Sequence, residues 1–272
     1  MKYQLIALDL DGTVLTNSKQ VTERTKSSLR LAARAGMEIV LVTGRPFMGL
    51  PRELTDLPFI RYAITSNGAV STDLSNGTRL RSALISNRDA CEILRLPVQS
   101  GLIYNVFLDG IGYCDKPSFD KLLGFFVGTP LEGYVRDSRR PVEDVFRLTE
   151  EHPEGVENIW IMGRDREERD RLGSLIQNQW HLNTVFTAGT DVEIGVPEAD
   201  KGAALRDLAS SLGIGRDAIL AFGDNENDPG MFRAAGTAVA MGNASDSVRQ
   251  SADLVTASNE QDGVARMIEE LL

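Results

Sequence analysis

The sequence predicts an α/β protein in which a parallel sheet covered by helices is interrupted by an α+β domain. Short apolar strands alternate with helices over residues 1–83, and the same alternation returns over residues 191–272. Residues 84–190 instead carry a hairpin signal and a more mixed set of elements. We therefore expect a Rossmann-like parallel-sheet core made of two chain segments, with residues 84–190 inserted between them.

The first core segment contains three expected strands and one clear helix. The strands are expected at residues 3–10, 37–44 and 61–68. The helix lies between the first two strands, with Thr22 as its N-cap and Gly36 as its C-terminal stop. Short apolar strands joined by a helix are typical of parallel sheets that are covered on both faces.

The second core segment follows the same pattern. A helix at residues 201–213 ends at Gly213, and the strand "AILAFGD" follows it. Asp228 and Pro229 fit the N-cap and first positions of a short helix. Two further strands and a terminal amphipathic helix are expected at residues 237–242, 252–258 and 261–272.

The inserted segment predicts an α+β domain. Two strands at residues 104–114 flank Asp109 and Gly110, a pair that favours a two-residue hairpin turn. Helices are expected at residues 118–127, 141–151 and 166–180, and strands at residues 156–163, 182–189 and 191–196. We place the boundary with the second core segment after residue 190.

Composition indicates a globular cytoplasmic protein. Hydrophobic residues make up 42% and charged residues 25% of the 272 positions, which is ordinary for such proteins. No apolar run is long enough to span a bilayer, and aspartates interrupt the N-terminal apolar stretch too early for a signal peptide. The two cysteines, Cys91 and Cys114, give no disulfide framework.

The charge balance limits the partners of this protein. The net charge of −10 disfavours nucleic acid and an anionic membrane surface, and no obligate protein partner is evident. The two histidines, His152 and His181, lie far in sequence from the acidic motifs. Acid–base chemistry at those motifs would therefore use carboxylates or lysine.

Four polar clusters each follow an expected core strand. They are Asp9 with Asp11, Thr43-Gly44-Arg45, Ser66-Asn67-Gly68, and the run "GDNEND" at residues 223–228. Ligands of open parallel sheets bind outside the carboxyl ends of the strands. We therefore expect the four clusters to converge on one site.

The paired aspartates predict a bound cation. Two like charges ~4 Å apart cost about 4 kcal/mol at a surface-like dielectric, so Asp9 and Asp11 need a compensating charge. Asp224 would add a third carboxylate, and hard oxygen ligands of this kind suit Mg²⁺. The candidate donors to an anionic substrate are Lys201, Arg45 and the hydroxyl of Thr43.

Each motif also has a plain structural interpretation. Asp11 followed by glycine fits an ordinary turn, and Asp228 fits the cap of the helix that begins at Pro229. Lys201 at a helix start is usually solvated, and Asn67 is as readily a turn residue as a functional one. The presence of all four clusters favours a shared site over four unrelated turns.

These motifs resemble those of the haloacid dehalogenase superfamily phosphatases, in the Cof-like branch with a type IIB (C2) cap. The matching residues, in the order of the family's motifs, are Asp9-Leu10-Asp11-Gly12-Thr13, Thr43-Gly44-Arg45, Lys201 and the run at residues 223–228. The inserted segment lies between the second and third motifs, where such a cap belongs. The resemblance covers essentially the whole chain.

The resemblance implies a phosphatase that works in two steps. Asp9 would attack phosphorus to form an aspartyl-phosphate, and Asp11 would act as general acid and then general base. Mg²⁺ would lie between Asp9, the backbone carbonyl of Asp11, and Asp224. The implied phosphate- or substrate-binding residues are Thr43, Gly44, Arg45, Asn67 and Lys201. Asn227 and Asp228 would order the metal's waters or the lysine.

The expected substrate is a small phosphorylated metabolite, such as a sugar phosphate, because an inserted cap would restrict entry to the site. A phosphomutase, which returns the phosphoryl group to a sugar, is an alternative with similar motifs. A noncatalytic Mg²⁺-binding switch, phosphorylated on its aspartate, is a second alternative that the large inserted domain disfavours. The products, or a long-lived aspartyl-phosphate without turnover, would distinguish these three functions.

Overall fold

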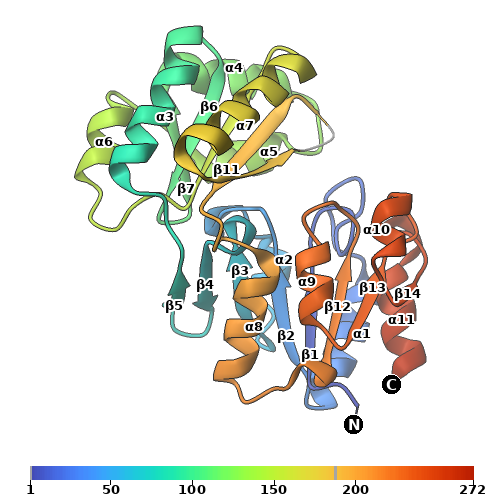
Figure 1. Ribbon diagram of the computed structural model, residues 1–272. Coiled ribbons are helices and arrows are strands. Elements are labelled where there is room, and N and C mark those ends of the chain that lie inside the picture. The colour runs from blue at the N-terminus through green and yellow to red at the C-terminus, as the bar shows by residue number, and fades with distance from the viewer. Residues whose placement is uncertain (1, 187–188) are drawn as a thin grey trace. The chain divides into compact units, whose positions relative to one another are not determined.

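The computed structural model describes residues 2–186 and 189–272, which form two compact units (Figure 1). The core unit comprises residues 1–44, 50–81 and 200–272, and the inserted unit comprises residues 45–49 and 82–199. The predicted class is confirmed: the core is an α/β fold with a parallel sheet, and the insertion is α+β.

The core unit is built on an eight-stranded sheet in the order β14-β13-β12-β1-β2-β3-β4-β5. Its strands are β1 (Leu5–Leu8), β2 (Glu38–Val42), β3 (Ile60–Thr65), β4 (Val70–Asp73), β5 (Thr78–Ser82), β12 (Ile219–Gly223), β13 (Thr237–Ala240) and β14 (Leu254–Val255). The strands from β14 to β3 are parallel, and β4 is antiparallel to β3. Strand β1 lies between β12 and β2, so its carboxyl end is central in the sheet.

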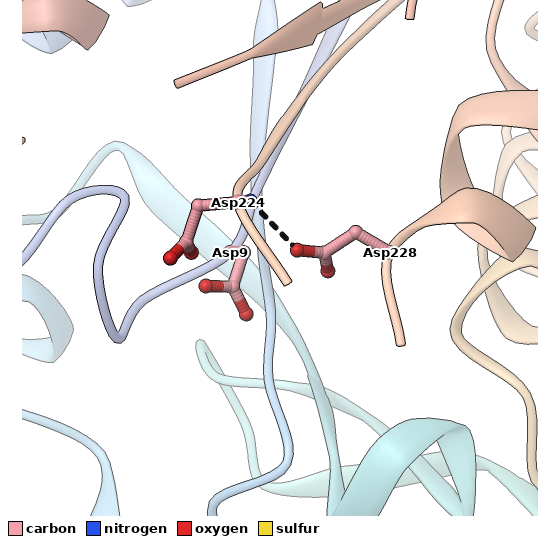
Figure 2. A group of neighbouring side chains, drawn as sticks. All are labelled: Asp9, Asp224 and Asp228. Carbon is pink, nitrogen blue, oxygen red and sulfur yellow. Dashed lines mark hydrogen bonds between the residues drawn. The ribbon is translucent and has the colours of Figure 1, made fainter. Parts of the chain in front are cut away.

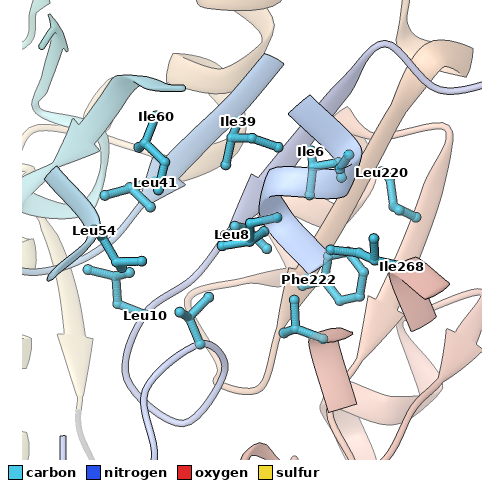
Figure 3. Packing of buried hydrophobic residues seen from close by; sticks show 14 of the residues in the cluster. Ile6, Leu8, Leu10, Ile39, Leu41, Leu54, Ile60, Leu220, Phe222 and Ile268 are labelled. Carbon is cyan, nitrogen blue, oxygen red and sulfur yellow. The ribbon is translucent and has the colours of Figure 1, made fainter. Parts of the chain in front are cut away.

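Side chains of β1 alternate between two hydrophobic cores, one on each face of the sheet. Ile6 and Leu8 pack in one core with residues of α1 (Glu23–Arg34), α2 (Arg52–Thr55) and α11 (Gly263–Leu271) (Figure 3). Leu5 and Ala7 pack in the other core, with residues of α8 (Lys201–Ser211), α9 (Pro229–Ala234) and α10 (Asp246–Gln250). Burial on both faces explains why the central strands β1 and β12 are apolar throughout.

The helix ends show one confirmed cap and one wrong one. The Thr22 side chain accepts a hydrogen bond from the backbone N–H of Thr25, as the predicted N-cap of α1 requires. Asp228 does precede Pro229 at the start of α9, but its side chain makes no capping hydrogen bond. The predicted capping role of that side chain is wrong, because its oxygens bind other groups.

The inserted unit contains a six-stranded sheet in the order β10-β11-β9-β6-β7-β8. Its strands are β6 (Ile103–Leu108), β7 (Ile111–Asp115), β8 (Arg139–Val142), β9 (Asn158–Met162), β10 (Asn183–Phe186) and β11 (Asp191–Gly195). The predicted hairpin is confirmed: β6 and β7 are antiparallel, and both turn residues, Asp109 and Gly110, have positive φ angles of 48° and 74°.

The helices of the inserted unit include two that the sequence analysis did not expect. They are α3 (Asn87–Ser100), α4 (Lys116–Phe126), α5 (Glu132–Ser138), α6 (Val145–Glu151) and α7 (Arg166–Trp180). Helices α3 and α5 are additional, and the expected helix at residues 141–151 begins four residues later because β8 occupies its first positions.

Single-turn 3₁₀ helices lie in both units, at η1 (Phe47–Gly49), η2 (Ser66–Gly68), η3 (Arg216–Ala218) and η4 (Asn259–Gln261).

The structure differs from the expected boundary after residue 190. Strand β11 pairs with β9 of the inserted unit, and its Val192 and Ile194 side chains pack in that unit's core. The chain therefore returns to the core unit at Asp200, after the hairpin of β10 and β11 is complete. The last residues of the expected strand 182–189 include 187 and 188, which lie outside the described residues.

Within residues 2–186 and 189–272, no helix combines the length and the apolar character needed to cross a membrane.

We predict that Gly202→Ala lowers the free energy of unfolding by about 1–3 kcal/mol, measured by chemical denaturation. An added Cβ at Gly202 would lie 2.1 Å from the carbonyl oxygen of Gly230, so helices α8 and α9 would have to separate. Gly215→Ala is the matched control, since a Cβ there meets no atom within 4 Å. Equal stabilities of the two variants would contradict this close packing.

Candidate active site

Three carboxylates and one ammonium group meet at the carboxyl ends of the central strands. Asp9 follows β1, Asp224 follows β12, and Asp228 directly precedes α9. Oxygen atoms of these three carboxylates lie within 4.8 Å of one another (Figure 2). The backbone N–H of Asp9 also donates to Phe222 (3.0 Å), which extends the pairing of β1 with β12 up to the site.

Lys201, the first residue of α8, holds two of these carboxylates. Its ammonium Nζ donates to Asp9 Oδ1 at 2.6 Å and to Asp228 Oδ1 at 2.7 Å. Lys201 is only 1% exposed, so the plain interpretation of a solvated lysine is wrong. A cation at a helix N-terminus is mildly unfavourable, and these two carboxylates supply the compensating charge.

Asp228 positions its neighbours through both of its oxygens. Oδ1 accepts from Lys201, and Oδ2 accepts from the backbone N–H groups of Asp224 (2.8 Å) and Asn225 (2.9 Å). Asp228 is fully buried, and these three hydrogen bonds satisfy a carboxylate that water does not reach. Its side chain therefore fixes both the lysine and the loop that carries Asp224.

The loop after β1 packs directly against Asp224. Thr13 Oγ1 donates to Asp224 Oδ1 at 2.9 Å. Gly12 has a φ of +86°, and a Cβ on it would lie 2.2 Å from Asp224 Oδ2. Only glycine accommodates both that backbone conformation and that contact, which is the local reason for the sharp turn after Asp11.

The cluster carries more negative than positive charge, so it favours binding of a further cation. Three carboxylates and one ammonium carry a formal charge of −2 when all are ionised. Burial, with the charges of Asp228 and Asp224, raises the pKa of Asp9 well above its ordinary value, although Lys201 opposes this. Burial and the charge of Asp228 raise the pKa of Asp224 to about 6.

The ammonium group stays charged in this environment. Burial lowers the pKa of Lys201, but the charges of Asp228 and Asp9 outweigh that effect and raise it overall. The lysine is therefore a fixed positive charge beside Asp9.

The donor set fits a hard divalent cation. Carboxylate oxygens are the ligands that Mg²⁺, Ca²⁺ and Mn²⁺ prefer, and here they come from two chain segments, the end of β1 and the run at residues 223–228. Since Asp228 is fully buried and accepts three hydrogen bonds, Asp9 and Asp224 are better suited to be direct ligands, and that expected role stays a prediction. Asn227 Oδ1 is buried and has no hydrogen-bond partner among the described residues. A buried oxygen without a partner is costly, so this atom is available to a bound ligand or to water.

Asp11 lies at the more exposed side of this cluster. Its Oδ1 accepts a hydrogen bond from Lys19 Nζ at 2.8 Å. The Asp11 side chain is 38% exposed and the Lys19 side chain 24% exposed. The negative charge of Asp11 makes a small contribution to the raised pKa of Asp224, after burial and the charge of Asp228. The expected role of the Asp11 backbone carbonyl as a metal ligand stays a prediction.

The loops after β2, β3 and β12 are linked by hydrogen bonds. The backbone N–H of Asn67 donates to the carbonyl of Thr43 (3.1 Å), and Asn227 Nδ2 donates to Asn67 Oδ1 (2.9 Å). Thr43 is 1% exposed and Asn67 6% exposed. Asn67 has a φ of 56°, a conformation that asparagine tolerates better than most residues. Their roles in phosphate binding stay predictions.

The second motif is divided between the two units. Gly44 ends the first stretch of the core unit, and Arg45 belongs to the inserted unit. There the Arg45 guanidinium lies 4.4 Å from the centre of the Tyr134 ring, and its NH1 donates to the carbonyl of Gly49 (3.1 Å). The expected substrate contacts of Gly44 and Arg45 stay predictions.

Three residues of this site were assigned no role by the sequence analysis. Thr13 lies inside the first motif, so its position and its hydroxyl could have identified it as a site residue. Asn243 follows β13, so the rule that polar residues gather at strand ends could have identified it. Its Nδ2 lies 3.3 Å from Asp224 Oδ2 and donates to it. Nothing in the sequence indicates that Lys19 pairs with Asp11.

Comparisons with known proteins give matches over nearly the whole chain. A family model described as haloacid dehalogenase-like hydrolase matches residues 6–268. The phosphatase YwpJ of Bacillus subtilis is 30% identical over 99% of this chain and 100% of its own. Pyridoxal phosphate phosphatase YbhA of Escherichia coli is 27% identical, over 98% of each chain. The solved structure of a haloacid dehalogenase-like hydrolase from B. subtilis is 30% identical over 100% of both chains, with a TM-score of 0.85.

We predict that Lys201→Met lowers the free energy of unfolding by about 3–5 kcal/mol, because it leaves two buried carboxylates without their cation. Urea denaturation at neutral pH measures this change. Lys26→Met is the matched control: Lys26 pairs with the more exposed Glu23 and Glu53 at the surface, so its loss costs about 1 kcal/mol or less. Equal losses in the two variants would contradict the structural weight given to Lys201.

Proposed function

This chain belongs to the haloacid dehalogenase-like hydrolases and is a phosphatase of that family, and on that premise we propose that it hydrolyses a small phosphorylated metabolite with Mg²⁺ as cofactor. The phosphoryl group would pass through an aspartyl-phosphate on Asp9. The observation that carries the proposal is the buried ammonium of Lys201 between Asp9 and Asp228, with Asp224 beside them.

Asp9 has the environment that a phosphate-attacking nucleophile needs. An anionic carboxylate approaching an anionic phosphate is repelled unless positive charge lies next to both. Lys201 occupies Oδ1 of Asp9 and fixes the side chain, which leaves Oδ2 as the attacking oxygen. The burial of Asp9 keeps bulk water from competing with the phosphate.

Mg²⁺ bound to Asp9 and Asp224 would neutralise charge on the phosphoryl oxygens. The other phosphate contacts and the positioning of Asp9 would come from side chains of the protein. Lys201 would contact a phosphoryl oxygen while it holds Asp9, and Thr43 would donate its hydroxyl to another. Asp228 would keep the lysine in place, because its other oxygen is anchored by two backbone N–H groups.

The reaction balances in two steps. In the first, Asp9 Oδ2 forms a bond to phosphorus, the bond from phosphorus to the ester oxygen breaks, and Asp11, which would carry a proton at the start of the cycle, gives that proton to the ester oxygen. In the second, Asp11 takes a proton from water, the water oxygen bonds to phosphorus, and the bond to Asp9 breaks. The products are the free alcohol and inorganic phosphate, and Asp9 and Asp11 return to their starting states.

The class of substrate is supported by relatives of similar length. The E. coli relative is named as a pyridoxal phosphate phosphatase, which acts on a small phosphorylated molecule. We propose a substrate of this size, either a phosphorylated cofactor or a sugar phosphate. Gly44, Arg45 and Asn67 are the residues proposed to contact it in addition to Lys201 and Thr43.

We predict that phosphate release from a panel of small phosphate esters requires both Mg²⁺ and Asp9. The panel includes pyridoxal 5′-phosphate and hexose phosphates, and inorganic phosphate is measured with Mg²⁺, with EDTA, and with Asp9→Asn. Loss of the nucleophile or the metal should lower the rate by at least about 10³-fold.

Asp246→Asn is the matched control, since Asp246 is an exposed aspartate whose partner is Arg249. It should keep the activity of the unmodified protein. Undiminished phosphate release from Asp9→Asn would remove the proposed nucleophile. An isomeric sugar phosphate in place of inorganic phosphate would indicate a phosphomutase.

A further inference from the structure

Asn243 joins two chain segments of the active site that are far apart in sequence. Its side-chain Nδ2 donates to the carbonyl of Gly12 at 2.9 Å and to Asp224 Oδ2 at 3.3 Å. Gly12 belongs to the loop after β1, whereas Asp224 belongs to the loop after β12. One amide group therefore ties the loop that carries the proposed nucleophile and acid to a proposed metal ligand.

The orientation of the Asn243 amide is fixed from its other side. Its Oδ1 accepts from the backbone N–H of Asn259 at 3.0 Å, so the NH₂ group must face Gly12 and Asp224. Asn259 is itself buried, and its Nδ2 donates to the carbonyl of Leu15 (2.9 Å) and to Asn17 Oδ1 (3.2 Å). The two asparagines thus hold the loop at residues 12–17 against the C-terminal part of the core unit.

Both carboxylate oxygens of Asp224 accept hydrogen bonds from neutral side chains. Thr13 donates to Oδ1 and Asn243 to Oδ2. Each carboxylate oxygen has two lone pairs, so one lone pair on each remains for a cation. Held by one donor on each oxygen, the carboxylate group of Asp224 is fixed in its rotation.

From this arrangement we propose that Asn243 is a positioning residue for the metal-binding carboxylates. It holds Asp224 and the Asp9–Thr13 loop in the relative placement that a divalent cation needs. The proposal rests on the proposed function, because it assumes that Asp9 and Asp224 bind the metal. Outer contacts of this kind set the affinity of a metal site by orienting its ligands in advance.

Asn243 is not itself placed to be a ligand. Its NH₂ group has no lone pair for a cation, and its Oδ1 already accepts from Asn259. An aspartate at this position would have nearly the same shape but would lose both donated hydrogen bonds and would repel Asp224. Asn243→Asp therefore separates a positioning role, which it destroys, from a ligand role, which it would strengthen.

We test the proposal by titrating the full-length protein with Mn²⁺ and measuring free Mn²⁺ by electron paramagnetic resonance. We expect the dissociation constant to rise about tenfold or more in Asn243→Ala and in Asn243→Asp. Asn76→Ala is the matched control, because Asn76 is an exposed asparagine that caps the turn before β5 through Thr78. It should bind Mn²⁺ like the unmodified protein.

Each outcome of the titration decides the proposal. An affinity of Asn243→Ala within twofold of the unmodified protein overturns it and leaves the proposed function standing. Tighter binding by Asn243→Asp also overturns it, since position 243 would then act as a ligand. Absence of Mn²⁺ binding in the unmodified protein overturns both this proposal and the proposed metal. Near-UV circular dichroism checks folding, and Asn243→Asp gives the same test if the alanine variant does not fold.

Discussion

The ammonium group of Lys201, buried between Asp9 and Asp228, is the interaction on which the rest of the site depends. Removing three charged groups from water costs several kcal/mol for each of them, and only close pairing offsets that cost. The pairing joins the end of β1, the start of α8 and the start of α9. It therefore fixes the three elements that carry the chemistry before any ligand arrives.

The sheet topology makes this pairing possible. Strand β1 lies between β12 and β2, so the loops that follow these strands emerge side by side at one edge of the sheet. Gly12 lets the first loop pack against the Asp224 carboxylate, and the hydrogen bonds of Thr13 and Asn243 hold the two together. Stability and function thus draw on the same contacts, because the groups that fasten the loops also orient the carboxylates.

The sequence predicted much of this arrangement because its strongest signals are local. Apolar runs predicted the core strands, and the rule of strand ends predicted that Asp9 and Asp224 would meet. The capping role of the Asp228 side chain was wrong because a local pattern cannot show that Lys201 and two backbone N–H groups compete for its oxygens. The boundary after residue 190 differed because alternation identifies β11 as a half-buried strand but not its partner. The pairing of Lys19 with Asp11 was not predicted, because the turn that brings them together has no sequence signature.

Diffraction from crystals grown with Mn²⁺, recorded for its anomalous signal, tests the central claim most directly. The account predicts one ion bound to carboxylate oxygens of Asp9 and Asp224, with Lys201 still paired to Asp228. An ion held elsewhere in the core unit, or a Lys201 side chain turned away from both Asp9 and Asp228, would contradict it.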